Sequence, residues 1–285
     1  MHSQSYRDIL TRDFILAFFA QTVFTSVFHL LIPTFPIYLS RWGSTEIEIG
    51  VLVGTVGFTS VAVRPFVGRA LIREREKLLM IVGALLTAVA SIAYLVLPPF
   101  WPLLVARGFQ GIGFACFHTA TITYIANISA GGPRAQTISY FALAMNVSAA
   151  LAPPLGILLI NRFDFVHLFL VCTALSFCSA FLSYTLGGRP DAPSSAQPTD
   201  DGFFLSRKAL PPAITSFLSL FIWGALTAFF PLYAVQHNVS NPGLFFTALA
   251  VMLILGLPLL ALSFADQIAP QLADRMLLVA QFASQ

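Results

Sequence analysis

The sequence predicts an all-α, polytopic membrane protein, and three observations support this fold class. Hydrophobic residues make up 57% of the 285 residues and charged residues only 9%, whereas soluble domains carry about 25% charged residues. The mean hydropathy is +0.83. The apolar residues are gathered in runs of about 20, the length of a helix that crosses a bilayer, and not in the alternating segments of about ten residues that form membrane barrels.

Eight such runs follow one another along the chain. We expect each to be a helix, because a helix satisfies its own backbone hydrogen bonds in hydrocarbon. The first run is longer than a signal-peptide core of about 7–15 residues, so we expect it to stay in the protein as a transmembrane helix. The runs cover residues 13–39, 48–67, 78–97, 102–128, 136–160, 165–186, 213–235 and 243–264.

The longest polar segment divides these runs into two groups. We expect a six-helix bundle over residues 1–187, a flexible linker over 188–212 that is rich in Pro, Ser and Asp, and an incomplete second bundle over 213–285. The second group holds two runs and a tail. The apolar stretch 276–280 in that tail is too short to cross a bilayer; we expect the beginning of a ninth helix, and the alternative is an amphipathic tail on the membrane surface.

Lys and Arg are distributed unequally between the two sides of the predicted helices. Basic residues favour cytoplasmic segments, and this rule places the N-terminus and the linker in the cytoplasm, with Arg41 and Arg162 in the outer segments. We therefore expect a multi-pass protein of the plasma or inner membrane. The predicted cytoplasmic set is Arg7, Arg12, Arg69, Arg73, Arg75, Lys77, Arg134, Arg189, Arg207 and Lys208.

Several function classes find no support in the sequence. The net charge of +3 is not gathered into the basic face of a nucleic-acid binder, so we expect no nucleic-acid partner. Cys116, Cys172 and Cys178 lie inside apolar runs, where cysteine behaves as a small hydrophobic residue. Neither a catalytic elbow nor a zincin, Walker or Rossmann motif is present, and we expect no enzyme activity, cofactor or metal.

The segment 64–77, after the second run, is rich in basic residues. Its spacing resembles the motif Gly-x-Leu-x-Asp-Arg-x-Gly-Arg-Lys that follows the second helix of major facilitator superfamily transporters. Gly68, Arg73 and Lys77 match the Gly, the Arg and the last basic position, and Arg69 adds a further charge. The resemblance implies a conformational latch between two halves. Departures from the motif include Ile72, Arg75 and Glu76, in place of Asp, Gly and Arg.

The fourth run resembles the superfamily's fourth-helix motif Arg-x-x-Gln-Gly at Arg107, Gln110 and Gly111. At 100° per residue, a polar stripe on this run shares one face. Polar side chains inside a membrane favour positions that face other helices or a cavity. The alternatives are that Arg107 extends to the headgroups and that His118 only bonds a neighbouring helix. The stripe consists of Arg107, Gln110, Phe114, His118 and Thr121.

The fifth run resembles the antiporter motif Gly-x-x-x-Gly-Pro-x-x-Gly of the same superfamily. Pro153 and Gly156 match it, while Ser148 and Ala152 replace two glycines. This resemblance favours export over import. The alternative is an ordinary packing interface, because small residues at this spacing let membrane helices approach closely.

The first run carries Gln21, Thr25 and His29 on one face. The resemblance implies that the first and fourth helices line a central cavity. The alternatives are that Thr25 bonds back to its own helix and that His29 is a partnered structural histidine. The predicted cavity and coupling residues are Gln21, Thr25, His29, Arg107, Gln110, His118 and Asn146, with Trp223 as a weaker candidate; the predicted conformational residues are Gly68, Arg69, Arg73, Lys77, Pro153 and Gly156.

These observations together predict a secondary active transporter, embedded in the lipid bilayer, that exports a small organic molecule by alternating access with protons as the coupling ion. Because no Asp or Glu lies deep in a run, the coupling proton would have to be carried by Asp13, His29 or His118; facilitated diffusion is the alternative. The superfamily's twelve helices form two bundles, so we expect eight runs not to complete the cycle alone. A non-transporting membrane remnant or assembly partner is the other alternative.

Overall fold

The computed structural model describes residues 11–73, 75–98, 100–129 and 134–187, together with scattered residues between 214 and 252. The predicted linker 188–212, the tail with its stretch 276–280, and Trp223 lie outside the described residues, as does most of the seventh and eighth runs. The described helices therefore lie in the predicted first bundle.

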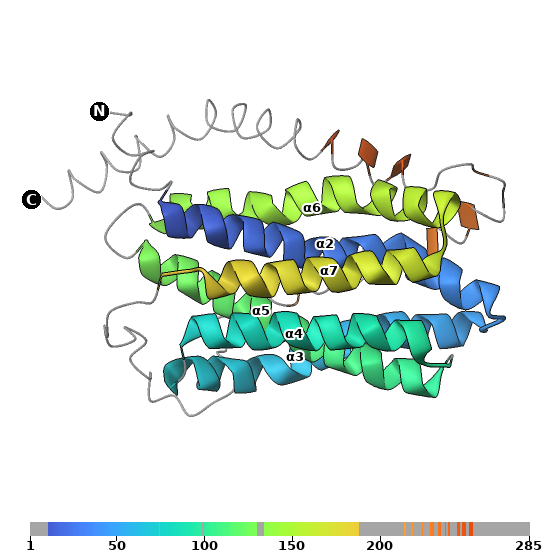
Figure 1. The fold of residues 1–285 in the computed structure, drawn as a ribbon, viewed down its shortest axis with the longest axis horizontal. Helices are drawn as coiled ribbons and strands as arrows, with labels where there is room; N and C mark the ends of the chain where they lie inside the picture. Colours follow the sequence, from blue (N-terminus) through green and yellow to red (C-terminus); the bar gives the residue numbers. More distant parts are fainter. Residues whose placement is uncertain are drawn as a thin grey trace, which may run out of the picture.

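Six helices form this part of the chain, and they correspond one to one with the first six predicted runs (Figure 1). The helices lie side by side along one long axis. The prediction of an all-α protein with a six-helix first bundle is confirmed. The helices are α2 (Arg12–Arg41), α3 (Glu46–Arg73), α4 (Glu76–Val96), α5 (Trp101–Ile128), α6 (Arg134–Arg162) and α7 (Phe165–Tyr184).

Helix α3 is longer than the sequence indicated. The predicted run stopped at residue 67 inside the basic segment, but the helix continues to Arg73 and includes Pro65. Arginine is a good helix former, and a proline inside a membrane helix is tolerated because local adjustments satisfy the freed backbone groups. As a result Arg64 is an interior residue of α3 and not the first residue of a loop.

The turn between α2 and α3 is held by local hydrogen bonds. Gly43 adopts a φ of +79°, and the backbone N–H of Ser44 donates to the carbonyl of Leu39 over 3.1 Å, an arrangement that favours glycine after a helix end. Thr45 and Glu48 then form a reciprocal capping box at the start of α3, with distances of 2.7 and 3.3 Å. This turn reverses the chain and brings α3 beside the bundle.

Glycines allow α5 to pack closely against α3 and α4. A Cβ on Gly111 would overlap Thr59 Oγ1 and lie 2.5 Å from the carbonyl oxygen of Val56 on α3. A Cβ on Gly113 would lie 2.7 Å from the carbonyl oxygen of Gly83 on α4. In lipid there is no hydrophobic driving force for helix association, so helices depend on close packing, which small residues allow. The two glycines therefore fix α5 between its neighbours.

Five of the six helices are long and apolar enough to cross a membrane by composition alone, namely α2, α3, α4, α6 and α7. Helix α5 is not among them, although it has 28 residues. Its sequence carries Arg107, Gln110 and His118, which lower its hydropathy, and the first two are buried between helices. Arg107 and Gln110 thus lie on the face of α5 that packs against its neighbours, while Val105 and Phe109 on another face are exposed.

The apolar core consists of two large clusters, one toward each end of the bundle, and a small third cluster of Val67, Ala115 and Cys116. The first surrounds Phe35, Tyr94 and Phe169, near the end of α2 and the beginning of α5. The second surrounds Phe24 and Phe117, whose rings stack with centroids 3.9 Å apart. The two clusters hold the six helices together from both ends.

Candidate functional site

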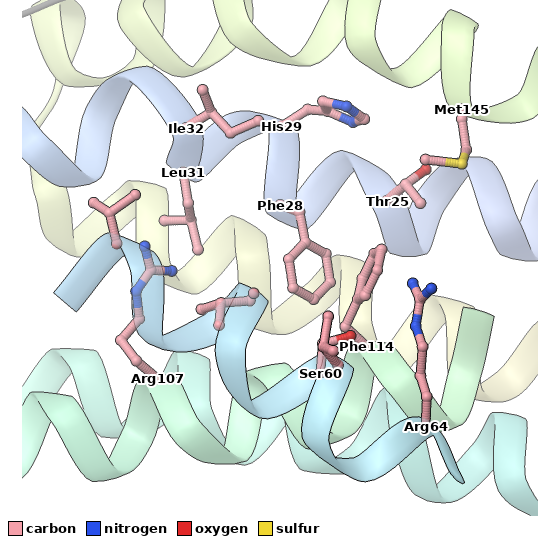
Figure 2. Close-up of a pocket in the computed structure, with 14 residues that line it drawn as sticks. Thr25, Phe28, His29, Leu31, Ile32, Ser60, Arg64, Arg107, Phe114 and Met145 are labelled. Carbon is pink, nitrogen blue, oxygen red and sulfur yellow. The ribbon is translucent and has the colours of Figure 1, made fainter. Parts of the chain in front are cut away.

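A cavity of about 430 Å³ opens between α2, α3, α5 and α6. Figure 2 shows Arg107 and Arg64 on opposite sides of it, with the rings of Phe28 and Phe114 between them. The lining is mostly apolar, as is usual for sites that bind small molecules. Its polar members are Thr25, His29, Ser60, Arg64 and Arg107.

Helix α3 contributes a continuous stripe to this cavity. Val53, Gly57, Ser60 and Arg64 all line it, and their spacing of four, three and four residues places them on one helix face. The sequence interpretation missed Ser60 and Arg64, because it assigned Arg64 to a cytoplasmic basic segment. The spacing of these residues was the signal that could have found them.

Arg107 is anchored at its edge of the cavity by neutral groups. The side chain is 5% exposed, its Nε donates to the carbonyl of Leu52 over 3.3 Å, and its Nη1 donates to Gln110 Oε1 over 2.7 Å. The hydroxyl of Tyr94 donates to the same Oε1 over 2.6 Å. The guanidinium also lies 3.9 Å from the ring centre of Phe35, a favourable cation–π geometry. Arg107 thus points inward and does not extend to the headgroups.

Two side-chain pairs join α2 to its neighbours. Gln21 Nε2 lies 3.0 Å from His118 Nδ1 on α5, and His29 Nδ1 lies 2.8 Å from Ser148 Oγ on α6. The His118 ring also stacks on Phe114, with centroids 5.2 Å apart. Both histidines are therefore partnered. His29 lies in the cavity lining, and His118 lies beside it, against Phe114.

The structure brings only some of the predicted cavity residues together. Thr25, His29 and Arg107 line the cavity, and Thr25 also bonds back to the carbonyl of Gln21 over 2.7 Å. The predicted stripe on the fourth run is divided, because Gln110 is buried against Tyr94 and Thr121 bonds back to the carbonyl of Phe117. The predicted residues that are not in the lining are Gln21, Gln110, His118 and Asn146; Met145 lines the cavity beside Asn146.

The predicted conformational residues of the basic segment have different surroundings. Among the described residues, nothing lies within 4 Å of a Cβ placed on Gly68. Arg69 is exposed. Lys77 Nζ donates to the carbonyl of Leu186 over 3.0 Å and lies 4.9 Å from the ring centre of Tyr184, so it caps the end of α7. The side chain of Arg73 lies outside the described residues.

The predicted motif of the fifth run packs against α2. A Cβ on Gly156 would lie 2.9 Å from the carbonyl oxygen of Leu30 and 3.1 Å from Thr34 Cγ2. Pro153 lies inside α6, one turn earlier. The close contact agrees with the packing-interface alternative, because only a residue without a side chain fits there.

The carboxylates of this bundle lie at the helix ends, away from the cavity. Asp13 accepts from the backbone N–H of Gly187 over 3.1 Å, and Glu76 accepts from Asn127 over 2.6 Å. Asp164 caps α7, and its pKa is lowered first by the hydrogen bond from the backbone N–H of His167 and then by that residue's side chain. In the portion described by the structure, no three His, Cys, Asp or Glu side chains gather in a way that could hold a metal ion.

Proteins to which the chain is similar include two exporters or resistance proteins of Staphylococcus aureus. The staphylopine export protein (strain Mu50 / ATCC 700699) is 22% identical over 252 residues, which cover 84% of this chain and 61% of that protein. The quinolone resistance protein NorA is 27% identical over 143 residues, which cover 50% of this chain and 37% of that protein. The chain spans less than two thirds of the length of these relatives.

The chain also matches the sequence profile of the Major Facilitator Superfamily over residues 14–284. That match includes all six described helices and the cavity between them. It agrees with the resemblance seen in the motifs of the second, fourth and fifth runs. Since this family consists of membrane transporters, the protein is a multi-pass membrane protein and not an enzyme. The chain belongs to the Major Facilitator Superfamily of transporters.

Proposed function

We propose that this protein exports a small organic molecule by alternating access, and that the cavity between α2, α3, α5 and α6 is the first bundle's share of the substrate path. The observation that carries the proposal is the cavity itself, about 430 Å³ in volume and lined by apolar rings with a few polar groups. Export as the direction is supported by the two relatives, whose names describe export and drug resistance.

We further propose that residues 213–285 belong to a second bundle that faces this cavity, with 188–212 as the cytoplasmic linker. In this arrangement the second bundle covers the cavity on the side of α3. Rocking of the two bundles then opens the cavity to each side of the membrane in turn. The N-terminus is cytoplasmic, in agreement with the distribution of Lys and Arg. A membrane-impermeant maleimide would then label a cysteine at position 44 in intact cells, and a cysteine at position 75 only after permeabilisation; the reverse pattern would invert the orientation.

Protons are the proposed coupling ion. His29 and His118 are the candidate carriers, because they lie in or beside the cavity and an imidazole nitrogen can accept and release a proton. Asp13 fits the role less well, since it bonds Gly187 at the end of the bundle.

Accumulation assays in cells that lack their own drug exporters test the proposal. Fluorescent anions, cations and neutral compounds would be measured with the protein, with an Arg107→Gln variant and with an Arg12→Gln variant, which changes an exposed arginine outside the cavity. We expect lower accumulation of at least one compound with the wild type and Arg12→Gln, and loss of this effect with Arg107→Gln. Equal accumulation with and without the protein would refute export, and export that a protonophore leaves unchanged would favour facilitated diffusion.

A further inference from the structure

We infer that the substrate is an organic anion whose carboxylate is bound by Ser60 and Arg64 on α3. This inference rests on the proposed transport function and adds the chemical class of the substrate. It comes from the charge of the cavity, from one unpartnered hydroxyl and from the register of α3.

The cavity has positive charge without a matching negative charge. Arg64 and Arg107 both line it, and no Asp or Glu is among the described residues of the lining. The carboxylates of Asp13 and Glu76, at helix ends, already accept hydrogen bonds from Gly187 and Asn127. The sequence between residues 202 and 265, which includes the seventh and eighth runs, also contains no Asp or Glu. Arg64 is exposed where it lines the cavity, and a guanidinium without a carboxylate partner attracts an anionic ligand.

Ser60 provides the second observation. The residue is 4% exposed, it lines the cavity, and its Oγ has no hydrogen-bond partner among the described residues. Its neighbours on α3 behave differently, since Thr55 and Thr59 bond back to the carbonyls of Val51 and Thr55 over 2.7 and 2.8 Å. A buried hydroxyl without a partner is unfavourable, so the free Oγ of Ser60 is available to donate to a ligand.

The positions of Ser60 and Arg64 suit one carboxylate. The two residues are four apart on one helix, where side chains lie next to each other, and Figure 2 shows both of them in the cavity lining. Within the described part of the chain Arg64 has no hydrogen-bond or ion-pair partner, so its planar guanidinium is free for a bidentate contact with a carboxylate. A serine hydroxyl can donate to the same group.

The rest of the ligand would lie against the rings of Phe28 and Phe114, whose centroids are 4.7 Å apart, and extend toward Arg107. Arg107 contacts the carbonyl of Leu52, twelve residues before Arg64, so the two arginines are about 18 Å apart along α3 at 1.5 Å per residue. Gly57 leaves open space between them, since nothing described lies within 4 Å of its Cβ position. The cavity therefore fits an elongated, partly aromatic anion, and a second acidic group could reach Arg107.

Binding of two matched fluorescent probes tests this inference. The probes are trans-stilbene-4,4′-dicarboxylate and trans-stilbene-4,4′-diamidine, which share a skeleton and differ in the sign of their charge. The full 285-residue chain would be placed in nanodiscs of zwitterionic lipid, so that no anionic headgroup competes for the arginines. We expect the dicarboxylate to bind at least about tenfold more tightly than the diamidine, because the anion gains charge-assisted hydrogen bonds.

Variants on α3 assign the site. Arg64→Gln should weaken dicarboxylate binding by about tenfold or more and Ser60→Ala by about fivefold, while Arg64→Lys keeps the charge and should lose less than Arg64→Gln. Arg12→Gln, at an exposed position, is the matched control and should bind as the wild type does. Circular dichroism and elution as a single species would show that each variant is folded.

The outcomes separate this inference from the proposed transport function. Tighter binding of the diamidine, or unchanged dicarboxylate binding in folded Arg64→Gln and Ser60→Ala, would overturn the inference even if the cells export some compound. Dicarboxylate binding that phosphatidylglycerol in the nanodisc abolishes would also overturn it, because the site would then take a lipid headgroup. Binding as expected in a protein that exports nothing would support the site and refute the transport proposal.

Discussion

At the scale of single residues, the buried arginine of α5 is held in place by uncharged partners. Arg107 bonds the carbonyl of Leu52 and the side-chain oxygen of Gln110, and Tyr94 bonds the same oxygen from α4. The amide oxygen can accept both hydrogen bonds because it has two lone pairs. This network orients Arg107 toward the cavity and leaves its positive charge without a carboxylate among the described residues, which is the property that the proposed anion binding requires.

Tyr94→Phe tests the contribution of this network. The change removes the hydroxyl but leaves Gln110 Oε1 bonded to Arg107, so no oxygen is left without a partner. We expect a loss of about 1 kcal/mol in the free energy of unfolding, measured in mixed detergent micelles. Tyr184→Phe is the control, because Tyr184 is 67% exposed and should lose almost nothing. Equal effects of the two changes would mean that the Tyr94 hydrogen bond adds no stability.

Asp164 gives a prediction for pH. The hydrogen bonds from His167 lower its pKa in the folded protein, so the carboxylate stabilises the start of α7 above its ordinary pKa of about 4, and this stabilisation is lost as the pH falls through the lowered folded pKa. Asp164→Ala should therefore destabilise the protein at pH 7 and have a smaller effect at pH 3. Glu46→Gln, at an exposed position, is the control. A destabilisation by Asp164→Ala that is the same at both pH values would contradict the capping role.

At the scale of elements, α5 is positioned by glycines and not by large side chains. Gly111 faces Thr59 and Val56 on α3, and Gly113 faces Gly83 on α4. A Cβ at either position would also lie 2.5 or 2.7 Å from a backbone carbonyl oxygen, of Val56 or Gly83, so rotating a side chain cannot fully relieve these contacts. The position of α5 decides where Arg107 lies, and packing thereby controls the shape of the cavity.

Gly111→Ala should destabilise the bundle by about 1–3 kcal/mol, because the added methyl group overpacks a contact with the α3 backbone. Gly54→Ala, also in a membrane helix, is the matched control: nothing described lies within 4 Å of its Cβ position, so it should be neutral or slightly stabilising. Thermal unfolding of the two variants in the same detergent would compare them. A tolerated Gly111→Ala would show that α3 and α5 are farther apart than the structure places them.

At the scale of the whole molecule, much of the bundle could be predicted from the sequence. The six described helices match the six predicted runs, because each run of about 20 apolar residues has only one stable form in a membrane. The end of α3 was predicted too early, since the basic segment was interpreted as a loop, and the helix continues to Arg73.

The candidate site was less predictable. Helical spacing correctly placed Thr25 and His29 on one face of α2 and marked Arg107 as inward-pointing, but it could not say which neighbour each side chain meets. In the structure Gln110 bonds Tyr94, and His118 bonds Gln21. These contacts could not be predicted because they depend on how separate helices pack. Ser60 and Arg64 were missed because the basic segment was interpreted as a loop, whereas α3 continues to Arg73 and both residues line the cavity.

If substrate passes through the cavity beside α3, that cavity must contain water. The reactivity of cysteines introduced there measures whether it does. In a protein whose Cys116, Cys172 and Cys178 are replaced by Ala, Gly57→Cys would place a thiol in the cavity lining, and Gly54→Cys would place one a turn earlier and outside that lining. Thiols react as thiolates, which require water. We predict that a small, charged thiol reagent labels position 57 much faster than position 54. Equal labelling at both positions, or none at position 57, would contradict the account.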